Sequence, residues 1–344
     1  MTVEPAAYSD EVLSVRGLGT RYAFQGASVP AVRDFSLSVR EGEIVGLVGE
    51  SGSGKSTVLK SILGMLKPPA EVTSDGIFLD GRDLREVSAK EMRRIRGGRL
   101  AMVFQDPINS FNPAWTIGNQ FRRVLSLHCP HLHRRDYDAE ILRLLNRVGI
   151  DGRGKLNSYP FEFSQGQLQR IMIAVACASP DLRVLLADEP TTSLDVTIEA
   201  QVLELLRDLR EERGLAMVLV THDLSVVAEM CDKVVVMYAG RVVEVAEVHD
   251  LFERPQHPYT RQLLKAIPDF PHDGRRLYAM RGAVPRLDEE VPGCTFAPRC
   301  DAHLGDVCDE VPPVLREIGP DGRRSACHKA NHATSLEETD DGVR

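Results

Sequence analysis

The chain alternates short apolar runs with amphipathic stretches, an arrangement that is typical of α/β proteins. Residues 44–48 form an apolar run that suits a buried strand, and residues 56–66 then place apolar side chains at helical spacing. Apolar, β-rich runs separated by helical patterns return over residues 183–246. We therefore predict an α/β core with an antiparallel edge to its sheet, assembled from residues 11–104 and 183–246.

The pattern between these two halves of the core differs from that of the core itself. Residues 140–148 and 167–178 carry apolar side chains at helical spacing, which predicts an inserted helical subdomain at about 106–180. After residue 253 the chain becomes rich in Pro, Gly and Cys, so we expect a separate C-terminal extension over residues 254–332. The polar and acidic residues 333–344 are expected to form a disordered tail.

Composition and charge narrow the class of protein. A chain of 344 residues with 43% hydrophobic residues is large enough for more than one domain. Its net charge of −8 makes a nucleic-acid-binding machine less favoured. No apolar run approaches the ~20 residues that cross a bilayer, and the first residues lack the pattern of a secretory signal. We therefore expect a cytoplasmic chain that reaches the membrane only through a partner.

The stretch "GESGSGKST" at residues 49–57 carries the clearest chemistry. Gly49, Gly54, Lys55 and Ser56 match G-x-x-x-x-G-K-[ST], a loop whose backbone N–H groups surround phosphate oxygens. The loop joins a predicted strand to the start of a predicted helix, where the helix dipole also favours an anion. We predict that Lys55 contacts the β- and γ-phosphates and that the Ser56 hydroxyl binds Mg²⁺. A glycine-rich turn with a solvated lysine is the alternative.

Two further strands end in candidate catalytic residues. The apolar run before Asp188 and Glu189 predicts a strand, so Asp188 is placed to hold Mg²⁺ and Glu189 to polarise the attacking water. An acidic junction between strand and turn is the alternative for this pair. His222 follows another apolar run, where a lone histidine is also compatible with a packing role.

Taken in order along the chain, these motifs resemble those of the ATP-binding cassette ATPases of ABC transporters. The resemblance spans nearly all of residues 8–265, and it indicates a cassette over residues 8–253 with a P-loop NTPase (RecA-like) core. It rests on the phosphate loop, on Asp188 and Glu189, and on five further elements: Tyr22, Gln105 in "MVFQDP", "FSQGQ" at 163–167, "SLD" at 193–195, and His222.

The resemblance implies a role for each of these residues. Tyr22 would stack on adenine, Gln105 would contact Mg²⁺ and water, and His222 would hold the γ-phosphate. Two cassettes would close head to tail, with Asp195 at the interface and the magnesium ion held by Ser56, Gln105 and Asp188. The implied ATP contacts are Gly49, Glu50, Ser51, Gly52, Ser53, Gly54, Lys55, Ser56 and Thr57 in one chain, facing Ser164, Gln165, Gly166 and Gln167 of the other.

Two longer segments resemble the peptide and nickel importer branch of that family. They are "FQDPINSFNPAWTIGNQF" at 104–121, read as a surface that docks on a permease, and "HPYTRQLLKAIP" at 257–268. The resemblance implies an ATPase subunit that powers import of di- or oligopeptides. Its implied partners are two integral-membrane permease subunits, a second and non-identical ATPase subunit, and indirectly an extracellular binding protein, with no nucleic acid. A nickel or other small-solute importer, a soluble ABC protein of translation or repair, and a structural nucleotide-binding scaffold are the alternatives.

Four of the seven cysteines lie in the extension, at Cys294, Cys300, Cys308 and Cys327. Disulfides are disfavoured in the cytoplasm, so clustered cysteines suggest a metal or redox site. Four thiolates suit either a [4Fe–4S] cluster or zinc, and the resemblance to peptide-importer ATPases favours the cluster. Zinc and unliganded thiols are the alternatives. Cys177, within an apolar helix, is expected to be a small buried hydrophobe.

The segment "FSQGQ" departs from the family's usual signature, because Gln165 stands where Gly is usual. If this position needs a positive φ, a side chain strains the backbone, and in any case it adds bulk where phosphate must approach. We therefore expect a heterodimer whose two ATP sites are unequal. A Gln165 side chain that points harmlessly into solvent is the alternative.

Overall fold

The structure is a computed structural model that describes residues 10–24, 27–192, 194–266, 280–286, 289 and 291–330. It divides into two compact units, and each is described by itself. The first unit contains Met1–Ser14, Leu37–Ile44 and Gly76–Val220, and the second contains Val15–Ser36, Val45–Asp75 and Thr221–Arg344. The expected tail at 333–344 lies outside the described residues.

Three parallel strands form the sheet of the first unit, in the order β7 (Leu100–Val103), β8 (Val184–Asp188), β9 (Ala216–Val220). Every residue of these strands is buried, which explains why the sequence shows them as continuous apolar runs. Leu100 pairs with Val184, and Val184 pairs with Ala216. The carboxyl ends of the strands therefore lie along one edge of the sheet.

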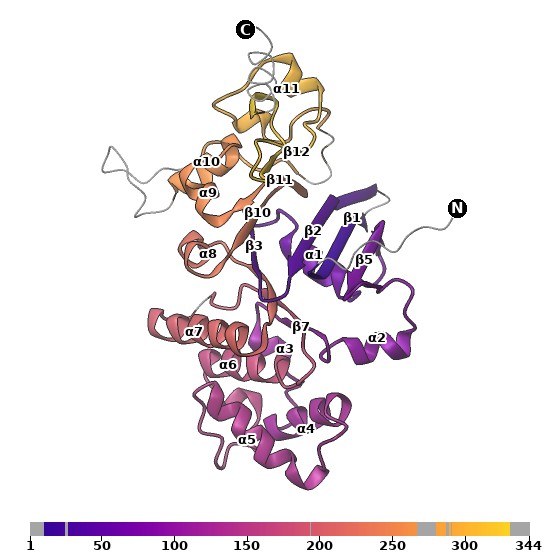
Figure 1. Ribbon diagram of the computed structural model, residues 1–344, viewed down its shortest axis with the longest axis vertical. Helices are drawn as coiled ribbons and strands as arrows, with labels where there is room; N and C mark the ends of the chain where they lie inside the picture. The colour runs from indigo at the N-terminus through magenta and orange to yellow at the C-terminus, as the bar shows by residue number, and fades with distance from the viewer. Residues whose placement is uncertain are drawn as a thin grey trace. The chain divides into compact units, whose positions relative to one another are not determined.

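Helices make up most of the rest of the first unit. Figure 1 shows α4 and α5 gathered next to α6, in agreement with the contacts of α5 with both α4 and α6. A short hairpin of β5 (Gly76–Leu79) and β6 (Arg82–Asp83) completes this unit. The helices are α2 (Ala89–Ile95), α3 (Pro107–Ser110), α4 (Ile117–His128), η1 (Arg134–Asp136), α5 (Tyr137–Arg147), η2 (Pro160–Glu162), α6 (Gln165–Ala176) and α7 (Val196–Arg213).

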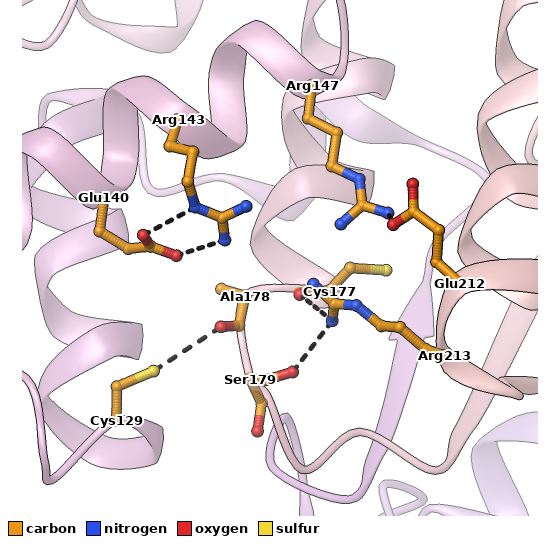
Figure 2. A network of polar contacts seen from close by, with 9 residues as sticks. All are labelled: Cys129, Glu140, Arg143, Arg147, Cys177, Ala178, Ser179, Glu212 and Arg213. Carbon is orange, nitrogen blue, oxygen red and sulfur yellow. Dashed lines mark hydrogen bonds and ion pairs between the residues drawn. The ribbon is translucent and has the colours of Figure 1, made fainter.

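The turn between α6 and β8 is held by polar contacts (Figure 2). Arg213, the last residue of α7, donates to the carbonyl oxygens of Cys177 at 3.0 Å and Ser179 at 3.2 Å. The Cys129 thiol lies 3.6 Å from the Ala178 carbonyl oxygen. Cys177 is 3% exposed, so the expectation of a small buried hydrophobe is confirmed, and burial raises the pKa of its thiol to about 12.

One sheet of the second unit has, in its described part, the strand order β12 (Arg316–Glu317), β13 (Arg324–Ser325), β11 (Arg241–Glu247), β10 (Lys233–Tyr238), β3 (Ile44–Val48). β10 runs parallel to β3, whereas β10–β11, β11–β13 and β12–β13 are antiparallel pairs. The predicted antiparallel edge is therefore confirmed. β1 (Glu11–Phe24) and β2 (Ala27–Arg40), which both pass through the two units, are neighbours in another sheet, where β4 (Ala70–Thr73) pairs with β1.

The remaining helices of the second unit are α1 (Lys55–Ile62), α8 (Leu224–Met230), α9 (Val248–Glu253), α10 (Pro258–Lys265), η3 (Ala297–Arg299) and α11 (Asp306–Glu310). α1 ends four residues earlier than the apolar pattern predicts. The reason is Gly64, whose φ of 61° is a left-handed conformation that ends helices.

Candidate functional site

The phosphate loop joins β3 to α1, in the strand–loop–helix order that the sequence predicts. The Nζ atom of Lys55 donates to the carbonyl oxygens of Gly49 at 2.6 Å and Glu50 at 2.9 Å, and it lies 3.3 Å from Oγ of Ser53. Lys55 is buried, so its charge is held inside the loop. The N-cap of α1 is Gly54, and the helix therefore presents its first N–H groups to an anion.

Two glycines of this loop are required by close backbone approach. A Cβ atom on Gly49 would lie 2.2 Å from the carbonyl oxygen of Met237, and one on Gly54 would lie 2.6 Å from that of Ala31. The φ of Gly54 is 103°, which L side chains rarely adopt. The motif therefore reflects the geometry of the loop as well as its affinity for phosphate.

Glu50 of the loop is bound to the C-terminal extension. Its carboxylate accepts two hydrogen bonds from the guanidinium of Arg299, at 2.8 and 3.0 Å. Its backbone N–H donates to the hydroxyl of Tyr259 at 2.8 Å. This pairing raises the pKa of Arg299, whose guanidinium also donates to the Tyr238 hydroxyl at 3.2 Å.

The catalytic candidates of the first unit meet at the edge of its sheet. Nε2 of Gln105 donates to Oε2 of Glu189 at 2.9 Å, and Oγ1 of Thr192 donates to the same oxygen at 2.8 Å. Glu189 has a φ of 48°, and its N–H donates to the Val220 carbonyl oxygen at 2.9 Å. Asp188, the last residue of β8, is only 2% exposed. The structure therefore brings Gln105 and Glu189 together, as parallel neighbouring strands require.

The signature segment forms the start of α6. Ser164 is the N-cap, with its Oγ accepting from the Gln167 N–H at 3.3 Å while the Gln167 side chain accepts from the Ser164 N–H at 3.0 Å. Gln165 is the first residue of the helix and does not have a positive φ. The condition for backbone strain at Gln165, a positive φ, is therefore not met, and its side chain is exposed. A Cβ on Gly166 would lie 3.2 Å from Cγ2 of Ile198.

The other predicted residues lie at element ends or on a strand. Asp195 is the N-cap of α7, and its Oδ1 accepts from the Ile198 N–H at 3.0 Å. Tyr22 is on β1, where it pairs with Ala70 of β4. His222 is exposed and follows β9 closely. Ser193 of "SLD" lies outside the described residues.

Comparison with known proteins decides the family. Residues 32–192 match the family model described as "ABC transporter", and residues 243–308 match "Oligopeptide/dipeptide transporter, C-terminal region". The dipeptide transport ATP-binding protein DppD of Escherichia coli (strain K12) is 43% identical over 318 residues, covering 92% of this chain and 96% of that protein. The chain belongs to the family of ATP-binding subunits of dipeptide and oligopeptide ABC transporters. It is therefore an ABC-type ATPase.

Further relatives agree with this assignment. The DppD protein of Bacillus subtilis (strain 168) is 44% identical over 307 residues, which cover 88% of this chain and 90% of that protein. Among solved structures, a dimeric bacterial ABC transporter cassette is similar with a TM-score of 0.61 and 28% identity. The similarity covers 69% of this chain and 98% of that cassette, which confirms the predicted P-loop NTPase fold.

The four cysteines of the extension carry free thiols. Burial first, and then the charges of Cys308, Cys300 and Cys327, raise the pKa of the Cys294 thiol to about 11. Among the described residues no three Cys, His, Asp or Glu side chains converge as metal ligands. The donor chemistry suits an iron–sulfur cluster or zinc, and a metal group on these cysteines stays a prediction.

Three contact residues of the ATPase were missed by the sequence analysis. Thr192 follows Glu189 by three positions, and this spacing could have suggested their contact. Tyr259 lies within the peptide-importer segment 257–268, yet nothing in that segment indicates a bond to the phosphate loop. Arg299 is one of many arginines, and its neighbour Cys300 is the only local signal.

The described helices include none that is long and apolar enough to cross a bilayer.

Proposed function

We propose that this ATPase powers the import of di- or oligopeptides through a membrane permease pair. The observation that carries the proposal is the presence in one chain of an ABC transporter segment and a C-terminal segment typical of oligopeptide and dipeptide transporters. The relatives named for dipeptide transport support the same cargo class. ATP binding would close a dimer of cassettes, and hydrolysis would reopen it.

For hydrolysis, we assign Glu189 to polarise the attacking water. Two hydrogen-bond donors, Gln105 and Thr192, fix one oxygen of its carboxylate. These two bonds orient the carboxylate, whose oxygens can accept a hydrogen bond from water and so polarise it. Mg²⁺ would be held by oxygen ligands from Ser56, Gln105 and Asp188, where it would offset the charge of the phosphates.

For nucleotide binding, we assign the adenine to Tyr22, the phosphates to residues 49–57 and the γ-phosphate to His222. The exposed Ser164 and the start of α6 would meet the nucleotide held by a partner cassette. Asp195 stabilises the start of α7 and would lie at the interface between the cassettes. These residues are accordingly divided between a site on this chain and a site completed in the partner.

A pocket in the helical part of the first unit supports docking on a permease. It has a volume of about 610 Å³, and its lining includes Trp115, Arg122, Arg123 and Tyr137. Trp115, the only tryptophan of the chain, is 46% exposed, whereas tryptophan side chains are highly buried on average. An aromatic side chain beside arginines suits the end of a helix that offers apolar and carbonyl groups. Through this contact the ATPase would sit at the cytoplasmic face of the membrane.

We further propose the predicted domain division, with a cassette at 8–253 that includes the helical subdomain near 106–180, and an extension at 254–332. The extension would hold a [4Fe–4S] cluster, or alternatively zinc, on its four cysteines. The second cassette of the dimer would be a non-identical chain. A nickel or other small-solute importer is the alternative within the family, and a soluble ABC protein without a permease is the alternative outside it.

The substitution Glu189→Gln tests the assigned chemistry. Its amide keeps the shape of the side chain but loses the charge that polarises water, so hydrolysis should fall by about 10²–10⁴-fold while ATP binding is kept. Turnover and nucleotide affinity would be measured in the assembled transporter with a dipeptide-loaded binding protein. Turnover near the wild-type rate would show that Glu189 is not the base. ATP turnover that is stimulated by nickel but not by dipeptides would overturn the proposed peptide cargo.

A further inference from the structure

The phosphate loop contains a carboxylate, although its substrate is a polyanion. Glu50 directly follows Gly49, the first glycine of the motif, and its side chain is 26% exposed. An unpaired carboxylate at this position would repel the phosphates, and the repulsion would be strong in a partly buried site. The loop therefore needs a compensating positive charge beyond that of Lys55.

Arg299 supplies that charge from the C-terminal extension. Its side chain is only 5% exposed, and its two terminal nitrogens each donate to a different oxygen of the Glu50 carboxylate. Its Nε donates to the carbonyl oxygen of Arg281 at 2.9 Å, and the guanidinium lies over the Tyr238 ring at 5.7 Å. The guanidinium is thus fixed on all sides in a bidentate pair.

The backbone of Glu50 is fixed as well. Its N–H donates to the Tyr259 hydroxyl, while its carbonyl oxygen accepts from Nζ of Lys55 at 2.9 Å and from the Ser53 N–H at 3.1 Å. Tyr259 packs against Tyr238 and Phe296, with ring centroids 4.7 and 5.4 Å away. One residue of the loop therefore connects the phosphate-binding lysine to the aromatic cluster that anchors the extension.

We propose that Arg299 is a positioning residue that sets the affinity of the phosphate loop for nucleotide by neutralising Glu50. The extension thereby tunes ATP binding through charge, in addition to any part it takes in stability. This inference rests on ATP binding at residues 49–57. Charge neutralisation differs from a merely structural role in what it predicts: the loss of affinity on removing Arg299 must grow with the number of phosphates on the ligand and shrink at high salt.

The experiment compares four full-length variants with the wild type. They are Arg299→Gln, Arg299→Lys, Glu50→Gln and the double variant E50Q/R299Q, with Arg143→Gln as matched control because Arg143 forms a bidentate pair with Glu140 at 2.6 and 2.9 Å. Affinities for ATP, ADP and adenosine would be measured by calorimetry at low and high salt. Steady-state ATP turnover would be measured in the assembled transporter, and unfolding would be followed in parallel.

We expect Arg299→Gln to weaken ATP binding about tenfold, or ~1.4 kcal/mol, ADP binding less, and adenosine binding not at all. KM should rise with kcat nearly unchanged, and the loss should shrink at high salt. Arg299→Lys should restore part of the affinity. Removing the carboxylate should rescue binding in E50Q/R299Q, and Glu50→Gln alone should bind ATP at least as tightly as the wild type.

Equal losses for ATP and adenosine, or a double variant as weak as Arg299→Gln, would overturn the proposal in favour of a structural role. If Arg299→Gln does not fold, Glu50→Gln decides, because weaker ATP binding by that variant contradicts charge neutralisation. Failure of the wild type itself to bind ATP would overturn the assignment of the loop and not the role of Arg299. Arg143→Gln should leave all three affinities unchanged.

Discussion

The backbone of Glu189 has a conformation that most residues avoid. Its φ of 48° costs a side chain about 1–3 kcal/mol, and the cost is offset by an N–H bond to Val220 and by two donors to the carboxylate. Strained residues that are held on all sides are common at functional sites. The sequence identified Glu189 from its neighbours, but a positive φ outside glycine has no signal in a pattern of apolar and polar positions.

The backbone of Gln165, in contrast to that of Glu189, does not have a positive φ. The family resemblance suggested that a side chain strains this position, whereas the residue is the first of a helix and has helical geometry. Any effect of Gln165 on hydrolysis must therefore come from its bulk and its exposed amide. Of the two effects that the sequence suggested, strain and bulk near phosphate, only bulk stays a prediction, because a usual glycine can mark close approach of a ligand as well as a special φ.

The substitution Gln165→Gly separates these causes. Since no strain is released and glycine is a poor helix residue, the melting temperature should stay the same or fall, with a cost of up to ~1 kcal/mol. Removing the side chain should raise turnover at the ATP site that this chain completes for its partner. Both would be measured in the assembled transporter, in a background where the partner's own glutamate is intact. Unchanged turnover would mean that Gln165 does not limit that site.

At the scale of elements, α6 and β8 are joined by the turn seen in Figure 2. The sequence predicted the helix and the strand from their apolar spacing, because both are buried over most of their length. It did not show that Arg213, at the far end of α7, holds this turn. Such contacts are absent from periodicity, since they depend on which carbonyl groups a tertiary fold leaves without a helical partner.

The turn is expected to transmit changes between the signature helix and β8, the strand that ends directly before Glu189. Arg213→Gln removes charge-assisted bonds to the Cys177 and Ser179 carbonyls, so the free energy of unfolding should fall by about 1–3 kcal/mol. Hydrogen exchange should quicken in the turn and at the start of β8. The control is Arg143→Gln, which breaks an exposed pair in the same network and should cost under about 1 kcal/mol. Equal effects of the two would show that the turn does not depend on Arg213.

At the scale of the molecule, the extension is continuous with the sheet of the second unit. β13 pairs with β11, and the buried Glu244 of β11 accepts from the N–H groups of Gln256 and His257 at 2.7 and 2.8 Å. Burial raises the pKa of Glu244 and lowers that of His257 to about 3, so His257 stays neutral. The sequence analysis predicted a boundary after residue 253 from a change in composition. Composition cannot reveal a strand as short as the two-residue β13, through which the extension pairs with the sheet.

The cysteines test how much of this extension depends on a bound group. Cys294, Cys300, Cys308 and Cys327 carry free thiols on a loop-rich segment, where a bound metal would contribute directly to folding. We expect anaerobically purified protein to be brown and to contain about four irons per chain. Cys300→Ser with Cys308→Ser should remove them, while Cys177→Ser, which alters a thiol buried apart from this group, should keep them. Because Cys300 directly follows Arg299, the double variant should also bind ATP more weakly.

Stoichiometric zinc in colourless protein would refute the cluster and retain a metal site. Protein without metal and with an unchanged melting temperature would show that the extension is held by its aromatic and ionic contacts alone.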